Sequence, residues 1–429
     1  MFQQDSKLRS EMEKVRGFAP FDIELYDLIA SVGLLAKLQP ELYAGVYKSP
    51  KSLQAEALAD ALGCIEVSDK EELFGAAYIR TLSSELIQKV VYMISEVEDF
   101  SQLAETLVRW IAETSGKQSG EAITSSSLVE LISALVADEV AGTVYDGSAG
   151  LANLATGVQH KKLILSEVNR ATWSLGSKLL LLKEIVADYQ CHNSLVIKGP
   201  SLQADLVVMQ PPWGLRLQSQ QLKDVVKKAP FVVTEKGKKI PTSAGDALWV
   251  QLALFHANDS GKVLLALPPG FFFRGGYDAK CRAYLLEHDV VEAVIALPER
   301  LNSFSSISTV LLILNKAKSK KQEGIVRFVD ASRMGSGKSQ CVFNADEIAS
   351  IVDLVQGKLP ESKNYKEVLL PEIYKNDNNL NVRHYTYEEE VLEVPSLSKE
   401  LDRLEKAKKK AIEAQTKLEK LLSLTASKG

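Results

Sequence analysis

From Gly142 onward the chain alternates short apolar runs with longer segments of helical character. This alternation is typical of a parallel sheet whose strands are joined by helices, so we predict an α/β fold. Strands are expected at residues 143–146, 162–167, 194–198, 205–209, 262–268, 291–298, 309–315 and 325–330. The runs at 291–298 and 309–315 have no helix between them, so one of these two strands is predicted to be antiparallel.

Helical periodicity dominates both sides of this sheet region. Helices are predicted at residues 23–38, 50–62, 82–111, 127–136, 170–186 and 247–258. At 429 residues the chain exceeds the size of a single core, and we predict four regions. They are an N-terminal helical domain (1–115), an α/β domain (116–335), a C-terminal extension (336–390) and an amphipathic tail (391–429). Leucines at 4-3 spacing between 397 and 424 favour a coiled-coil-like helix that docks on a partner over one that folds back.

Composition limits the classes of function. The net charge is −4, so contact with a nucleic acid requires a local basic patch or a partner. Six lysines between residues 223 and 239 are such a patch, with a solvated surface as an equal alternative. No apolar run reaches the roughly 18 residues of a membrane span, and residues 1–20 resemble no signal peptide. The four cysteines are far apart, and the histidines lack metal spacing, so we expect a cytoplasmic protein without membrane contact or bound metal.

The strongest local motif is the strand 205–209 followed by Gln210-Pro211-Pro212-Trp213-Gly214. Prolines remove backbone donors and leave nearby carbonyl oxygens free, while Trp213 offers a flat face to a planar ligand. Two acidic residues lie at the ends of earlier strands. Asp146 precedes a run of small residues, and Glu167 can accept hydrogen bonds from two ribose hydroxyls. In this order the motifs predict a nucleotide-like ligand site beside a site for a planar group.

These motifs resemble the DNA methyltransferase (modification) subunit of type I restriction-modification systems, an adenine-N6 methyltransferase family. Residues 210–213 resemble the family's Asn/Asp-Pro-Pro-aromatic loop, and residues 376–385 resemble its Asn-Asp-x-x-Leu-Asn-x-x-x-Tyr segment. The chain also resembles the family at residues 120–124, 246–274 and 294–314. The last of these ranges includes Phe304.

Four departures from the family pattern stand out. Gln210 replaces the usual Asn, and Ser125 replaces a proline. In the loop after Asp146, Leu151, Ala152 and Asn153 replace Ser, Gly and Gly, and we expect Leu151 and Asn153 to crowd the cofactor or to change the backbone path. The family's Asp on the third strand has no evident counterpart.

The resemblance implies a Rossmann-like class I methyltransferase sheet with an N-terminal helical domain and a C-terminal coiled-coil-like helix. It implies S-adenosylmethionine as cofactor, held by Thr124, Asp146, Gly150 and Glu167. It also implies a catalytic loop of Gln210, Pro211, Pro212 and Trp213 that holds a flipped adenine from double-stranded DNA for methylation at N6. The implied partner is a specificity subunit that selects the DNA sequence. The resemblance leaves open whether a restriction or translocase subunit of a defence complex also binds.

Gln210 leaves a second hypothesis open. Gln carries the same amide as Asn one methylene further out, and a displacement of about 1 Å can cost on the order of a hundredfold in rate. The alternative is therefore a catalytically impaired subunit that acts as a scaffold or DNA clamp. A third hypothesis, methylation of a protein glutamine or an RNA adenine, is disfavoured by residues 376–385. The segment 335–339 resembles part of a phosphate loop but is interpreted as a flexible loop, and Trp249 as a core residue.

Overall fold

The computed structural model describes residues 2–15, 23–67, 73–74, 76–114, 123–138, 141–197, 199–221, 240–302, 307–338, 340–386 and 397–426. The lysine patch at 223–239, Phe304 and residues 120–122 of the predicted cofactor entry lie outside these ranges. The chain forms two compact units, Met1–Thr386 and Tyr387–Gly429. Because the N-terminal helices and the sheet share the first unit, the domain limits at 115 and 335 stay a prediction.

The described residues form one nine-stranded sheet with the order β3-β2-β1-β4-β5-β7-β6-β8-β9. Its strands are β1 (Ala141–Asp146), β2 (His160–Glu167), β3 (Asp188–Cys191), β4 (Ala204–Met209), β5 (Ala257–Leu267), β6 (Val291–Ala296), β7 (Val310–Asn315), β8 (Ile325–Asp330) and β9 (Tyr365–Leu369). β7 is antiparallel to both of its neighbours, as predicted, and β9 is antiparallel to β8. All other strands are parallel to one another, so their carboxyl ends meet at one edge of the sheet. The α/β prediction is confirmed.

Two strands differ from the sequence prediction, and both lie at the edges of the sheet. The strand expected at 194–198 is wrong, because the third strand is β3 at Asp188–Cys191. Leu195 and Ile197 are buried in the core from a loop, which explains why their apolar run resembled a strand. β9 at the opposite edge was not predicted. Edge strands are less buried than central ones, so they lack the continuous apolar pattern.

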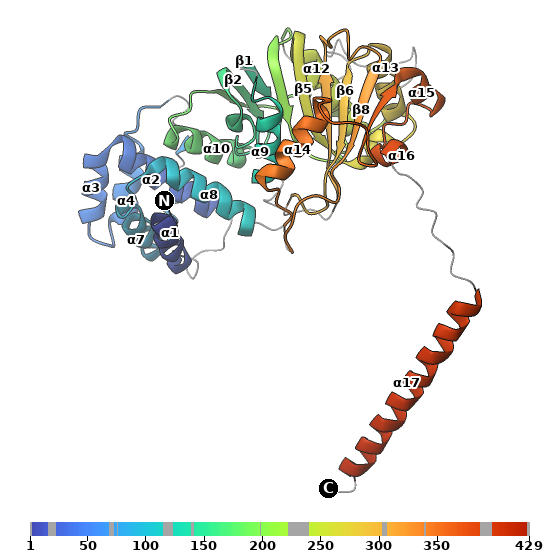
Figure 1. Cartoon of the computed structure of the whole chain (residues 1–429). Helices are drawn as coiled ribbons and strands as arrows, with labels where there is room; N and C mark the ends of the chain where they lie inside the picture. The colour runs from blue at the N-terminus through green and yellow to red at the C-terminus, as the bar shows by residue number, and fades with distance from the viewer. Residues whose placement is uncertain are drawn as a thin grey trace. The chain divides into compact units, whose positions relative to one another are not determined.

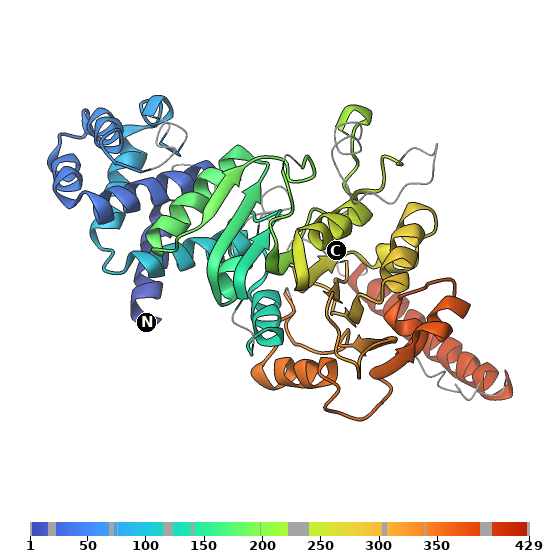
Figure 2. The same cartoon turned by 90° about the horizontal axis from the view of Figure 1, so that it is seen from above.

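Helices cover both faces of the sheet (Figures 1 and 2). One face packs on α12 (Gly245–His256) and α13 (Tyr277–Glu287), and the other on α9 (Ser126–Leu135) and α14 (Ala345–Val355). Strand residues alternate between the two cores. Val207 belongs to the α12 side and Val208 to the α14 side. Such burial on both faces explains the continuous apolar runs of the central strands.

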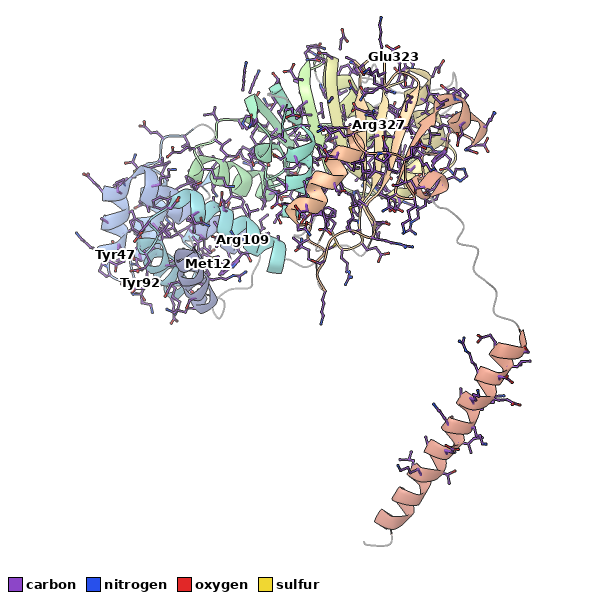
Figure 3. The ribbon with its side chains drawn as sticks, in the orientation of Figure 1. Met12, Tyr47, Tyr92, Arg109, Glu323 and Arg327 are labelled. Atoms are coloured by element: carbon purple, nitrogen blue, oxygen red, sulfur yellow. The ribbon has the colours of Figure 1, made fainter. Side chains whose placement is uncertain are left out.

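The N-terminal helices pack against α10 (Arg170–Leu182), which follows β2 (Figure 1). They are α1 (Phe2–Val15), α2 (Ile23–Leu38), α3 (Pro40–Lys48), α4 (Gln54–Leu62), α6 (Ala76–Ile79), α7 (Ser84–Ser95) and α8 (Phe100–Thr114). Their shared core includes Met12 of α1, labelled in Figure 3, and Trp173 of α10.

An ion pair fastens α2 to α10 inside this core. The Lys178 side chain is 0% exposed, and its Nζ lies 2.5 Å from Oδ2 of Asp27. Ser174 Oγ donates to the other Asp27 oxygen at 3.2 Å, and Lys178 Nζ lies 5.4 Å from the centroid of the Phe74 ring. Burial lowers the pKa of Lys178 below its usual value, and the charge of Asp27 opposes that shift.

The segment at 376–385 is bonded to α13 and to the turn that follows β5. Arg282, which is 2% exposed, donates to the carbonyl oxygens of Phe271, Arg274 and Asn378 at 2.6, 2.8 and 2.9 Å. The Leu380 amide donates to the Phe272 carbonyl at 2.8 Å. These bonds hold the segment to the short helix η3 (Pro269–Phe272) that follows β5.

Shorter elements complete the first unit. They are η2 (Ala155–Gly157), α15 (Leu370–Lys375) and α16 (Val382–Thr386). Arg327 of β8, labelled in Figure 3, pairs with Glu367 of β9 at 2.9 Å and fixes the edge strand.

The second unit is the helix α17 (Leu397–Ala426), which agrees with the helix expected in the tail. Its apolar side chains at Leu401, Leu404, Ile412 and Leu418 are 51%, 51%, 64% and 57% exposed. Among the described residues, no helix has the length and apolarity needed to cross a membrane.

Candidate functional site

A cavity of about 290 Å³ opens where the carboxyl ends of β1, β2 and β4 meet. Distant parts of the chain converge on it. Its lining includes Ser148, Gly150, Glu167, His192, Gln210 and Trp249. Because the carboxyl edge of a parallel sheet is where ligands bind in α/β folds, this cavity is the candidate site.

The loop after β1 is held in place by Glu167. Its Oε2 accepts a hydrogen bond from the Gly150 amide at 3.1 Å, and its Oε1 accepts one from the Asn169 amide at 2.7 Å. The Tyr189 hydroxyl donates to the Gly150 carbonyl. Gly150 has a φ of +55°, a conformation that favours glycine. The result is a fixed turn that presents backbone to the cavity.

The departures in this loop do not crowd the cavity. Leu151 is 3% exposed and packs in the core of the N-terminal helices. Asn153 forms two bonds with the backbone of Thr124. Its Nδ2 donates to the Thr124 carbonyl at 2.6 Å, and its Oδ1 accepts from the Thr124 amide at 3.2 Å. Neither residue lines the cavity, so the expectation of crowding is not met. Ala152 has a φ of +64°, which shows that the loop accepts alanine in a left-handed conformation.

Asp146 ends β1 directly beneath this loop and is 1% exposed. Burial raises the pKa of its carboxyl to about 7, although the Ser148 amide, which donates to Oδ1 at 2.9 Å, opposes the shift. The charge of Glu167 adds to the increase. The carboxyl group of Asp146, beneath the β1 loop, therefore titrates near neutral pH.

This raised pKa predicts how an Asp146→Asn variant behaves. The pKa of about 7 in the folded protein exceeds the ordinary 3.8, so the folded state binds this proton more tightly than the unfolded state. Ionisation of the Asp146 carboxyl therefore destabilises the folded protein. This loss of folding stability is absent below about pH 4, grows as the pH rises, and is complete above about pH 7, where it is at most about 4 kcal/mol. The asparagine side chain carries no charge, so we expect the variant to melt several degrees higher than wild type at pH 8. The difference should narrow at pH 5, and a difference that widened on acidification would contradict this assignment.

The loop after β4 is anchored on both sides. Trp213 Nε1 donates to the Ala266 carbonyl on β5 at 3.1 Å, and the Gly214 amide donates to Oδ1 of Asp246 on α12 at 3.1 Å. Arg274 forms ion pairs with Asp246 and, at 2.8 Å, with Asp278. The Pro-Pro-Trp loop therefore has a fixed position relative to β5 and α12.

Two buried polar atoms beside the cavity have no hydrogen-bond partner among the described residues. They are Gln210 Oε1 and Trp249 Nε1, and both residues line the cavity. Buried polar groups nearly always have a partner, so these atoms indicate bonds that a ligand completes. Together they offer an acceptor and a donor. The described residues contain no group of three His, Cys, Asp or Glu side chains placed to hold a metal ion.

The structure brings together some of the residues expected from sequence. Gly150, Glu167, Gln210 and Pro212 line the cavity. The remaining predicted residues, Thr124, Asp146, Pro211 and Trp213, lie outside its lining. The first two support the β1 loop, and Trp213 anchors the β4 loop on β5.

Sequence reasoning missed Ser148, His192 and Trp249 as lining residues. His192 directly follows β3, and the misplaced third strand hid it. Trp249, interpreted as a core residue, is indeed 5% exposed, but its indole nitrogen lies without a partner beside the cavity. A sequence pattern carries no signal for such an unpaired atom.

Comparisons with known proteins agree with this architecture. A family model described as N-6 DNA Methylase matches residues 95–394. The methylase subunit of a type I restriction enzyme from Methanocaldococcus jannaschii is 28% identical over 377 residues, covering 80% of this chain and 64% of the relative. The corresponding subunit from Mycoplasma pneumoniae is 26% identical over 341 residues, with 72% and 61% covered. The chain thus spans less than two thirds of the length of these relatives.

Solved structures share the fold. The methyltransferase subunit of a type I restriction-modification system from Streptococcus thermophilus superimposes with a TM-score of 0.73 at 20% identity, covering 89% of this chain and 98% of that chain. A chain from structural work on complex assembly in the type I system gives a TM-score of 0.68 at 15% identity, covering 97% and 98%.

Proposed function

Because the chain belongs to the N-6 DNA methylase family, we propose that it transfers a methyl group from S-adenosylmethionine to the N6 amine of adenine in DNA. We propose further that it does so as the modification subunit of a type I-like restriction-modification or defence complex. The observation that carries the proposal is the cavity at the carboxyl edge of β1 and β4. It joins the β1 loop to the Pro-Pro-Trp loop and presents two buried polar atoms, Gln210 Oε1 and Trp249 Nε1, without partners among the described residues.

The residues around the β1 loop fit the cofactor. Gly150 presents backbone to the cavity, and each Glu167 oxygen accepts one amide bond and retains capacity for a ribose hydroxyl. We propose that Asp146, Gly150, Glu167 and Thr124 hold S-adenosylmethionine, with Asp146 and Thr124 acting through the loop. When bound, the cofactor supplies an electrophilic methyl group.

The residues after β4 fit an exocyclic amine. The adenine amine is a poor nucleophile because its lone pair is delocalised into the ring. We propose that Gln210 Oε1 and the Pro211 carbonyl accept the two amine hydrogens, which favours a tetrahedral nitrogen. The buried Gln210 oxygen, at a residue only 9% exposed, is an acceptor without a competing partner among the described residues. Trp213, fixed by its bond to Ala266, is proposed to pack on the flipped base.

The exposed apolar side chains of α17 support the proposal that the tail binds a partner subunit. The four exposed apolar side chains of α17 form a seam that a helix alone in water leaves solvated. We propose that a specificity subunit docks on residues 397–424, and that a restriction or translocase subunit joins through the assembled complex. A specificity subunit also accounts for DNA binding by a chain whose net charge is −4.

The decisive experiment detects N6-methyladenine by long-read sequencing of DNA from cells with and without this gene. We expect a set of adenines in one recognition sequence to be methylated only when the gene is present. Titration of the purified chain with S-adenosylmethionine by calorimetry should show binding. If the chain bound no cofactor, alone or with its partner, and no adenine changed, the catalytically impaired scaffold would replace the enzyme as the function.

Trp249 gives a sharper prediction for the cavity. A Trp249→Phe variant keeps an aromatic ring but removes the unpartnered indole N–H. We expect kcat/KM for DNA methylation to fall about tenfold, as for one lost hydrogen bond, while the melting temperature stays level or rises.

The matched control is Trp173→Phe, because the indole N–H of Trp173 donates to the Tyr189 carbonyl at 3.0 Å in a buried core. This control should lower the melting temperature and leave kcat/KM nearly unchanged. A loss of stability without a loss of activity in Trp249→Phe would show that Trp249 has only a packing role.

A further inference from the structure

A second and larger cavity, of about 500 Å³, lies at the carboxyl ends of β6 and β8. Pro269 and Phe272 of η3, which follows β5, form part of its wall. Because β6 and β8 run parallel to β4 and β5, this cavity opens at the same edge of the sheet as the first. The two linings have no residue in common. It is therefore a separate site, further along the edge on which the proposed target base is held.

Three arginines from three separate segments line this cavity. Arg300 follows β6, Arg333 follows β8, and Arg383 lies in α16, and all three are exposed. One acidic residue, Glu299, is among the lining residues. A local charge of about +2 in a chain of net charge −4 is a marked concentration of positive charge.

The arginines retain donors for a ligand. Arg300 Nη1 donates to the Lys338 carbonyl, and Arg383 Nη2 donates to Ser332 Oγ at 3.5 Å. A guanidinium group has five N–H donors, so these contacts leave most of them available. Arg300 also has a φ of +59°, a conformation that is uncommon for a residue other than glycine.

Two glycines, Gly335 and Gly337, also line the cavity. Gly335 and Gly337 have φ values of +82° and +128°, and a Cβ would lie 2.5 Å from Cys341 Sγ or 2.0 Å from the Gln340 carbonyl oxygen. The Gly335 amide donates to Glu347 Oε1 at 2.7 Å, and Ser336 pairs with Val342 through two backbone bonds. This segment, interpreted from sequence as a flexible loop, thus contains a glycine turn held by hydrogen bonds.

We infer that this cavity binds phosphodiester groups of the DNA backbone. Guanidinium groups recognise phosphate through paired hydrogen bonds, and the small polar residues Ser308, Ser332 and Ser336 leave room for a backbone. The inference rests on the proposed function, since it takes DNA as the substrate. It adds that the arginine-lined cavity contributes affinity that does not depend on base sequence.

The test is DNA binding by the full chain, followed through the fluorescence anisotropy of a short labelled duplex between about 50 and 200 mM salt. The triple variant Arg300→Gln, Arg333→Gln, Arg383→Gln removes the three charges. We expect its Kd to rise at least tenfold at low salt, and the slope of log Kd against log salt to fall by about 2 to 3. Its affinity for S-adenosylmethionine, measured by calorimetry, should equal that of wild type, which also shows that the variant is folded.

The control is a second triple variant that loses the same three positive charges at residues outside both cavities. Lys48, Lys51 and Lys161 are exposed and line neither cavity, so Lys48→Gln, Lys51→Gln, Lys161→Gln should bind DNA nearly as wild type does. Equal DNA binding by the two triple variants, or no DNA binding by wild type at low salt, would overturn the inference. So would arginine-dependent binding of inorganic phosphate without arginine-dependent binding of DNA. If adenines remained unmethylated while DNA binding still required the arginines, the proposed function would fail and the inference would stand.

Discussion

Replacing Gln210 with alanine will lower the rate of DNA methylation by about a hundredfold or more and leave the affinity for S-adenosylmethionine nearly unchanged. Gln210 Oε1 is the buried acceptor proposed for an amine hydrogen, and alanine removes this oxygen, which has no partner among the described residues. The rate is measured with the assembled complex under single-turnover conditions, and the cofactor affinity by calorimetry. Full activity in Gln210→Ala would remove this residue from the proposed chemistry.

Gln210→Asn is the informative companion, because Asn is the residue usual at this position in the family that the motif resembles. If the longer side chain displaces the base by about 1 Å, Asn restores the alignment and the rate rises by up to about a hundredfold. A fall in rate with Asn would show that the cavity is adapted to glutamine. Trp213→Ala should lower the rate as well, but it also removes the bond to Ala266, so its melting temperature must be measured beside its activity.

The second large effect concerns stability. Asp27→Ala leaves Lys178, whose side chain is 0% exposed, without its ion-pair partner. Breaking a buried pair by removing one member costs about 3–5 kcal/mol, and we expect about 3 because Asp27 itself is 29% exposed. Urea unfolding followed by circular dichroism measures the loss of folding stability. The lost stability should include that of the N-terminal helices where they pack on α10.

Two controls define the cause of that loss. Asp60→Ala breaks the exposed pair with Arg80, whose two side chains are 67% and 48% exposed, and should cost less than about 1 kcal/mol. The double variant Asp27→Ala, Lys178→Met replaces the pair with an apolar side chain and should recover most of the stability. If the double variant were as unstable as Asp27→Ala alone, the unpaired charge would not be the source of the loss.

The central part of the fold could be predicted from sequence because its strands are covered on both faces. For this reason β4 (Ala204–Met209) contains a continuous apolar run at residues 206–209, and β7 (Val310–Asn315) contains one at residues 310–314. β3 reads Asp-Tyr-Gln-Cys at Asp188–Cys191, and its exposed side chains show no apolar pattern. The buried loop residues Leu195 and Ile197 attracted the strand prediction instead. Burial without sheet pairing is a tertiary effect that local periodicity does not record.

The candidate site could be predicted only in outline. Gly150, Glu167 and Gln210 lie at or just after the ends of their strands, so the strand ends indicated them. Trp249 comes from a helix and reaches the cavity because α12 packs against the sheet. The arginine-lined cavity joins residues that are far apart in the chain, among them Arg300 and Arg383, and no local motif connects them.

The pair between Asn153 and Thr124 has a consequence for tolerance to mutation. Both bonds use the backbone of residue 124 and the side chain of residue 153. These two bonds therefore constrain the identity of residue 153 and not that of residue 124, whose side chain is 8% exposed and affects folding only through its packing. In a scan of all substitutions, position 153 should reject most amino acids on grounds of stability alone. Any intolerance at position 124 among variants that fold normally would then report contact with a ligand, which separates the demands of the fold from those of the chemistry.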